Sequence, residues 1–120
     1  MVVDDEAEIA AMAKEMLEGM GYAVAAFTSA AEAMAAFSAN ASGYDLVITD
    51  LTMPGITGVE LSRRLLEIRP DLPIILCSGL GETVSASAIG TVGIRRFLNK
   101  PILLHEYGRA VREVLDGRHG

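Results

Sequence analysis

The chain has 120 residues, 51% of them hydrophobic, and carries a formal net charge of −6. This length fits one domain with a hydrophobic core, and the apolar content argues against disorder. No apolar run approaches the roughly 18 residues of a membrane span, Cys77 has no second cysteine for a disulfide, and no basic stretch before an apolar one indicates a signal peptide. We therefore expect a cytoplasmic domain that does not insert into a membrane.

The charge is divided unevenly along the chain. Residues 1–60 hold ten acidic residues and one basic residue, whereas residues 61–120 hold six acidic and nine basic residues. An acidic first half argues against direct binding of nucleic acid, which requires a basic surface.

Five short runs of apolar, often β-branched residues predict strands. They lie at residues 1–3, 22–27, 46–48, 74–77 and 96–98. The runs at 46–48 and 74–77 are apolar throughout, which is typical of strands that are buried on both faces of a parallel sheet.

Between these runs, apolar residues recur at helical spacing. Gly19 to Gly21 ends the first predicted helix, Ser29 can cap the second, and Pro70 ends the third. The predicted helices cover residues 9–17, 30–40, 59–68, 82–89 and 104–115. This alternation predicts an α/β fold, with helices on both faces of a parallel sheet and a ligand site beyond the carboxyl ends of the strands.

Polar residues follow four of the predicted strands. These are Asp4 with Asp5 after the first, Asp50 after the third, Ser78 after the fourth and Lys100 after the fifth. Each has a structural explanation, because aspartates cap helices or start turns, a lysine is often a solvated charge, and serines often end strands. Their occurrence together at one sheet edge favours a functional site.

If the first and third strands are neighbours, their backbones lie about 5 Å apart. Asp4, Asp5 and Asp50 then repel one another unless a cation neutralises them, and Mg²⁺ suits such hard oxygen ligands. Lys100 can pair with Asp50 or with an anion bound there. A carboxylate beside a divalent cation and a lysine can attack an incoming phosphoryl group.

The residues at these strand ends resemble the receiver domain of two-component response regulators. The resemblance covers essentially the whole chain, residues 1–120, and the motifs that carry it are specific in combination. They are residues 2–6 (VVDDE), residues 45–55 (DLVITDLTMPG) with Gly58, Ser78-Gly79, and residues 97–101 (FLNKP).

The resemblance implies a single doubly wound (βα)5 domain of the flavodoxin-like type, with strand order 2-1-3-4-5. It makes Asp50 the phosphoryl acceptor, with Mg²⁺ as the cofactor. Asp5, Asp50 and the backbone carbonyl of Thr52 would bind the ion directly, and Asp4 would hold it through water.

The resemblance also assigns the switch. Lys100 and Ser78 would contact the phosphoryl oxygens, with the backbone N–H of Gly79 nearby. Phe97 would turn inward when the Ser78 hydroxyl moves, changing the face formed by the fourth helix, fifth strand and fifth helix. A core position for Phe97 remains the structural alternative. Ser78 stands where threonine is more usual, and Leu80 and Thr52 lie where family members tune the lifetime of the phosphorylated state.

The resemblance further implies partners and a regulatory role. A histidine kinase or histidine phosphotransfer domain would donate the phosphoryl group, and an output domain or protein would read the switched face. The domain would not be an enzyme beyond catalysing its own phosphorylation and dephosphorylation. Only three residues precede Asp4 and no output domain follows, so we expect a module excised from a longer protein, such as a hybrid histidine kinase. A genomic reading frame with these same ends would contradict that expectation.

Two alternatives stay open at this point. A haloacid-dehalogenase-like phosphatase also uses an aspartate nucleophile with Mg²⁺, but it requires a second aspartate two positions later, where this chain has Thr52. A docking module that is never phosphorylated would not need the complete set of site residues.

Overall fold

The strands form one parallel sheet in the order β2-β1-β3-β4-β5. The computed structural model describes residues 1–53, 55–79, 94–100 and 102–117. The strands are β1 (Val2–Val3), β2 (Ala26–Phe27), β3 (Val47–Asp50), β4 (Ile74–Ser78) and β5 (Arg96–Asn99). The expected strand order 2-1-3-4-5 is confirmed, and β3 and β4 lie where the apolar runs predict them.

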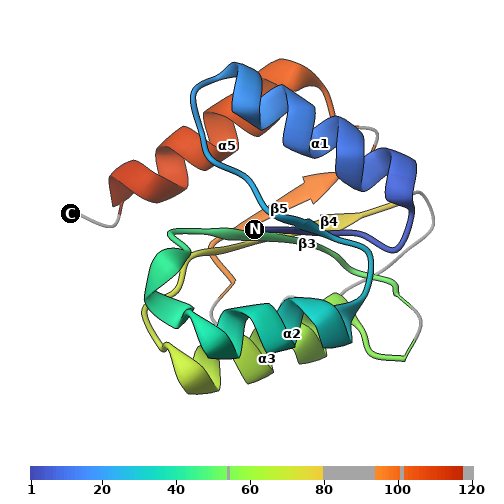
Figure 1. Cartoon of the computed structure of the whole chain (residues 1–120). Helices are drawn as coiled ribbons and strands as arrows, with labels where there is room; N and C mark the ends of the chain where they lie inside the picture. Colours follow the sequence, from blue (N-terminus) through green and yellow to red (C-terminus); the bar gives the residue numbers. More distant parts are fainter. Residues whose placement is uncertain (54, 80–93, 101, 118–120) are drawn as a thin grey trace.

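Within the described residues, two pairs of helices cover the two faces of this sheet. In Figure 1, α1 and α5 lie on one face, and α2 and α3 lie on the other. The helices are α1 (Ala7–Gly19), α2 (Ala30–Ala39), α3 (Gly58–Ile68) and α5 (Leu104–Gly117), and a short 3₁₀ turn η1 (Ala41–Gly43) precedes β3. The predicted helix over residues 82–89 and the position of Leu80 lie outside the described residues.

The buried strand residues alternate between two hydrophobic cores. Ile48 and Ile75 pack with α1 and α5, whereas Val47 and Ile74 pack with α2 and α3. Successive side chains of a strand point to opposite faces, so a strand covered on both sides must be apolar at every position. This is the physical reason for the continuous apolar runs in the sequence.

Local signals position the helices on the α2–α3 face. The Ser29 side chain accepts a hydrogen bond from the backbone N–H of Glu32, and Thr57 does the same for Glu60. Both are N-cap interactions, which satisfy N–H groups that have no partner within the helix. The caps set where α2 and α3 begin, and α3 therefore starts just after the loop that follows Asp50.

The second strand is shorter than the apolar run at residues 22–27 predicts. β2 contains only Ala26 and Phe27, which pair with Val2 and Val3 of β1. Because β1 offers two residues for pairing, the preceding stretch has no strand partner in register. Its backbone contact with β1 is the hydrogen bond from the N–H of Val2 to the carbonyl of Ala25.

Among the described residues, no helix is long and apolar enough to cross a membrane.

Candidate functional site

The carboxyl ends of the parallel strands bring the predicted site residues to one edge of the sheet. Asp4 and Asp5 follow β1, Asp50 ends β3, Ser78 ends β4, and Lys100 follows β5. Because β1, β3, β4 and β5 are consecutive in the sheet, residues that are 96 positions apart in the sequence become neighbours.

Three carboxylates form the centre of this edge. One oxygen atom from each of Asp4, Asp5 and Asp50 can be chosen so that all three lie within 4.8 Å of one another. Asp4 and Asp50 are only 5% and 6% exposed, whereas Asp5 is exposed. Like charges at such separations repel strongly where water is excluded, so the cluster needs positive charge close to it.

Lys100 supplies part of that positive charge. Its Nζ lies 2.9 Å from Oδ2 of Asp4 and 3.0 Å from Oδ1 of Asp50. Burial opposes the charged form of Lys100, but its hydrogen bonds to Asp4 and Asp50 outweigh burial and raise its pKa above the usual range. The lysine therefore remains an ammonium at neutral pH and bridges two buried carboxylates.

Asp4 serves the first helix as well as the carboxylate cluster. Its Oδ1 accepts a hydrogen bond of 2.9 Å from the backbone N–H of Glu6, the residue before α1. Its Oδ2 accepts from Lys100. The structural explanation that these acids support the start of a helix holds for Asp4, and the same side chain also belongs to the site.

The donor set fits a hard divalent cation. Three carboxylates and one ammonium leave a net charge of −2, and the oxygen atoms lie close enough for one ion to contact several of them. Mg²⁺ prefers oxygen ligands and is usually held by one or two carboxylates while it keeps several waters. Asp50 and the exposed Asp5 offer such oxygens, and the exposed position of Thr52 lies two residues after Asp50.

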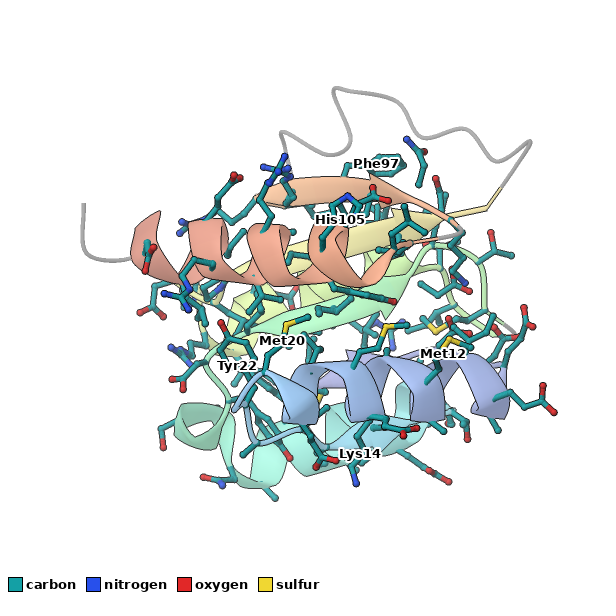
Figure 2. All side chains as sticks on the ribbon, turned by 90° about the horizontal axis from the view of Figure 1, so that it is seen from above. Met12, Lys14, Met20, Tyr22, Phe97 and His105 are labelled. Atoms are coloured by element: carbon teal, nitrogen blue, oxygen red, sulfur yellow. The ribbon has the colours of Figure 1, made fainter. Side chains whose placement is uncertain are left out.

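Ser78 and Phe97, the predicted switch residues, lie on the neighbouring strands β4 and β5, where Phe97 pairs with Leu76, two residues before Ser78. Ser78 is 1% exposed, and its hydroxyl donates a 3.4 Å hydrogen bond to Oδ1 of Asn99 on β5. Phe97 is half-buried on β5, the edge strand, and Figure 2 shows it on the far side of α5 from α1. Gly79 directly follows Ser78 and is half-buried.

Two features near the site are not evident from the sequence pattern. Asn99 contacts Ser78 because the two residues pair in the register of β4 and β5. Gly58 approaches the backbone of Asp50 so closely that a Cβ atom there would lie 2.2 Å from the Asp50 carbonyl oxygen. Both residues lie within the motifs that carry the family resemblance, but those motifs do not indicate which atoms Asn99 and Gly58 contact.

Comparison with known proteins finds a matching family and several similar proteins. The family described as "Response regulator receiver domain" matches residues 1–112. The transcriptional regulatory protein DctD of C4-dicarboxylate transport from Rhizobium meliloti (strain 1021) is 34% identical over 117 residues, which are 98% of this chain and 25% of that protein. The sensor kinase CckA from Brucella abortus (strain 2308) is 29% identical over 116 residues, 97% of this chain and 12% of that kinase.

A solved structure shares the whole fold. The response regulator receiver domain protein from Clostridium thermocellum superposes with a TM-score of 0.92 at 29% identity, covering 98% of this chain and 94% of that one. By contrast, the chain spans a quarter or less of the length of the regulator and the kinase named above. The haloacid-dehalogenase-like alternative finds no support in these comparisons. The match over residues 1–112 and the shared fold show that the chain belongs to the receiver-domain family of response regulators.

Proposed function

We propose that this domain, over residues 1–120, accepts a phosphoryl group on Asp50 from the phosphohistidine of a histidine kinase or histidine phosphotransfer domain. One observation carries the proposal: the Asp50 carboxylate lies 3.0 Å from Lys100 and within the carboxylate cluster of Asp4 and Asp5. A nucleophile, a fixed cation and oxygen ligands for a divalent ion therefore meet at one point, as phosphoryl transfer requires.

In the transfer, an oxygen of Asp50 forms a bond to phosphorus while the bond from phosphorus to the imidazole nitrogen breaks. The imidazole keeps the electron pair of that bond and takes up a proton. Lys100 faces the acceptor carboxylate and neutralises charge on the phosphoryl oxygens. Mg²⁺, when bound, supplies further positive charge to the same oxygens.

The carboxylates divide the work of holding the ion. Both oxygens of Asp4 already accept hydrogen bonds, from the N–H of Glu6 and from Lys100. Asp5 is exposed and Asp50 faces it across the cluster. In our proposal Asp5, Asp50 and the backbone carbonyl of Thr52 contact Mg²⁺ directly, and Asp4 acts through water.

Phosphorylation then changes what Ser78 and Phe97 contact. A phosphoryl group adds negative charge and three strong acceptor oxygens next to Asp50. The Ser78 hydroxyl leaves Asn99 to donate to this group, and Phe97 turns inward. The change is a population shift, limited by how much better the phosphoryl group is held in the switched state.

We assign the domain a regulatory role with no separate substrate turnover, in the cytoplasm, with an output domain or protein reading the face around β5 and α5. The output partner is not a nucleic acid in this proposal. The acidic half of the chain contributes the carboxylates of the site, and the basic residues of β5 and α5 are partly engaged in ion pairs, such as Arg96 with Glu113.

The test is phosphorylation with acetyl phosphate and Mg²⁺, followed by intact mass spectrometry. We expect a single labile phosphoryl adduct on the wild-type protein and none on Asp50→Asn. Absence of the adduct with acetyl phosphate, phosphoramidate and a panel of phosphorylated histidine kinases would support the docking module. Continuous release of phosphate from an organic phosphate would support a phosphatase.

A further inference from the structure

The first turn of α3 lies against the peptide that carries the acceptor aspartate. A Cβ atom added at Gly58 would lie 2.2 Å from the carbonyl oxygen of Asp50 and 2.8 Å from Cδ1 of Leu76. The first contact involves a backbone atom, which cannot rotate away as the end of a side chain can. Helix α3 therefore approaches β3 this closely because residue 58 has no side chain.

Backbone hydrogen bonds hold the two elements in this arrangement. The N–H of Gly58 donates to the carbonyl of Leu51 at 2.7 Å, and the N–H of Leu51 donates to the carbonyl of Cys77 at 2.7 Å. Leu51, the residue after the acceptor, is thus held from α3 through its carbonyl and from β4 through its N–H.

Two buried hydroxyl groups bond to backbone carbonyls on the two sides of this contact, one within α3 and one within β3. Ser62, one turn along α3, donates to the carbonyl of Gly58 at 2.7 Å, and Thr49 donates to the carbonyl of Asp50 at 3.1 Å. Both side chains are 0% exposed within an otherwise apolar layer. A buried hydroxyl must be hydrogen-bonded to be tolerated. The Ser62 bond fixes the first turn of α3, where Gly58 meets Asp50, and the Thr49 bond ends on the carbonyl of Asp50 itself.

We propose that Gly58 and Ser62 are positioning residues for the phosphoacceptor. Together they set where the peptide after Asp50 lies, and through it where the Asp50 carboxylate lies relative to Lys100 and Asp5. The partners of Asp50 come from other strands, so a shift of this peptide moves the acceptor away from them. The inference rests on the proposed phosphoryl transfer and adds residues that touch neither the phosphoryl group nor the metal ion.

The size of the shift makes the consequence measurable. A Cβ at 2.2 Å from a carbonyl oxygen must be relieved by movement of α3 or of the Asp50 peptide. Phosphoryl transfer requires its groups to be held within about 0.5 Å of the productive geometry. A displacement that is small enough for the domain to stay folded is therefore large enough to slow phosphoryl transfer.

Two variants test the proposal, with a third as a control for stability. Ser62→Ala removes one hydroxyl and adds no atom, and Gly58→Ala adds the clashing Cβ. Val111→Ala truncates a side chain that is 2% exposed in the core on the α1–α5 face of the sheet, so it lowers stability without touching α3. All measurements are made at a temperature where every variant is folded.

Three quantities are measured on each protein. They are the rate of phosphorylation by acetyl phosphate at saturating Mg²⁺, the Mg²⁺ affinity by calorimetry, and hydrogen exchange of the Leu51 amide without metal. We expect phosphorylation to slow about fivefold in Ser62→Ala and more than about tenfold in Gly58→Ala. Mg²⁺ affinity should fall and Leu51 should exchange faster in both, while Val111→Ala stays within about twofold of the wild type in rate and affinity.

The outcomes separate this inference from the proposed function. If the α3 variants lose stability as Val111→Ala does but keep wild-type phosphorylation and Leu51 exchange, Gly58 and Ser62 only pack the core and the inference is wrong. If the wild-type protein itself takes up no phosphoryl group, the proposed function fails, and Leu51 exchange still decides whether α3 positions the acceptor peptide. If Gly58→Ala does not fold, Ser62→Ala decides the question.

Discussion

The ammonium nitrogen of Lys100 lies 3.0 Å from the Asp50 carboxylate, although β4 separates β3, which ends at Asp50, from β5, which ends just before Lys100. The same ammonium lies 2.9 Å from Asp4, beyond β3. One lysine thus reaches the ends of two other strands. It neutralises the buried carboxylates of Asp4 and Asp50, and in the proposed function it also faces the phosphoryl group on Asp50.

Replacing Lys100 with methionine removes this cation and leaves the Asp4 and Asp50 carboxylates buried together. Without Mg²⁺, we expect the free energy of unfolding to fall by at least about 1–3 kcal/mol, the range for a buried hydrogen-bonding group that loses its partner, because a charged group costs more. Added Mg²⁺ should recover much of the loss, because it neutralises the same oxygens. Urea unfolding with and without Mg²⁺ measures both effects.

Lys14→Met is the matched control for that substitution. Lys14 lies 3.6 Å from Glu18 on the exposed face of α1, in a surface ion pair. Its loss should change stability by less than about 0.5 kcal/mol, with or without Mg²⁺. Equal metal-free stability of Lys100→Met and the wild type would show that the bridge to Asp4 and Asp50 contributes nothing.

The two aspartates after β1 should differ in their effect on metal binding. Both oxygens of Asp4 accept hydrogen bonds, whereas Asp5 is exposed beside Asp50. We expect Asp5→Asn to weaken Mg²⁺ binding at least about tenfold, because the loss of even a supporting contact of a metal ligand costs about 10- to 100-fold. Asp4→Asn should weaken it less. Isothermal titration calorimetry compares them, and an equal or larger loss in Asp4→Asn contradicts this division of roles.

The hydrogen bond between Ser78 and Asn99 should hold back phosphorylation slightly. At 3.4 Å it is weak, and it must break before the Ser78 hydroxyl can donate to a phosphoryl group. We expect Asn99→Ala to raise the rate of phosphorylation by acetyl phosphate about two- to fivefold. The control is the same substitution in a Ser78→Ala background, where no gain should appear. A gain of the same size there would mean that Asn99 acts by another route.

Because the pKa of Cys77 is raised by burial, the free energy of unfolding should fall at alkaline pH. Burial raises the pKa of its thiol from 9.0 to about 12, with Lys100 nearby acting in the opposite direction. Above pH 9 the unfolded chain ionises while the folded protein keeps the proton, so stability falls as pH rises from 9 towards 12. The slope for one such group is about 1.4 kcal/mol per pH unit.

Chemical denaturation at pH 8 and pH 10.5 measures this loss, and Cys77→Ala should reduce it. The pKa values of Lys100 and Tyr107 are also raised, so loss of protons from these groups likewise lowers the free energy of unfolding as the pH rises. Part of the alkaline loss of stability therefore remains in the variant. In the native wild-type protein at pH 8, iodoacetamide should not modify Cys77. Rapid modification without unfolding would show that the thiol is accessible.

The methionine that follows α1 packs against a glycine of α5 and should adapt to a larger residue. A Cβ at Gly108 would lie 3.2 Å from Sδ and 3.3 Å from Cε of Met20, which is 37% exposed. Figure 2 shows Met20 reaching from α1 towards α5. Because these atoms are the flexible end of a side chain, we expect Gly108→Ala to gain about 0.5–1 kcal/mol from helix propensity. Gly108→Leu should instead destabilise the domain, and urea unfolding tests both.

Much of the fold was predictable because its signals are local. Ser29 and Thr57 mark helix starts through contacts with residues three positions away. The runs around Val47 and Ile74 predict doubly covered strands because each residue must bury its own side chain. The order of the strands required the resemblance to a known family, since periodicity within one strand says nothing about its neighbours.

The candidate site likewise has features that the sequence predicts and features that it does not. The sequence alone predicted that Asp4, Asp50 and Lys100 lie at strand ends and showed their chemical types. That Lys100 contacts both Asp4 and Asp50 was not, because it depends on the lateral order of strands and on the reach of one side chain across β4.

The uneven distribution of charge along the chain shows most directly what the sequence determines and what the tertiary structure determines. The amino-acid sequence alone determined that acids dominate the first half, that the strands are apolar, and that a lysine and a serine end two of them. The tertiary structure decided which of these charged side chains are in contact. It also decided that Ser78 donates a hydrogen bond to Asn99 and that Gly58 lies against the Asp50 backbone. Those contacts depend on register and on packing between distant segments, and neither leaves a mark in the local pattern of residues.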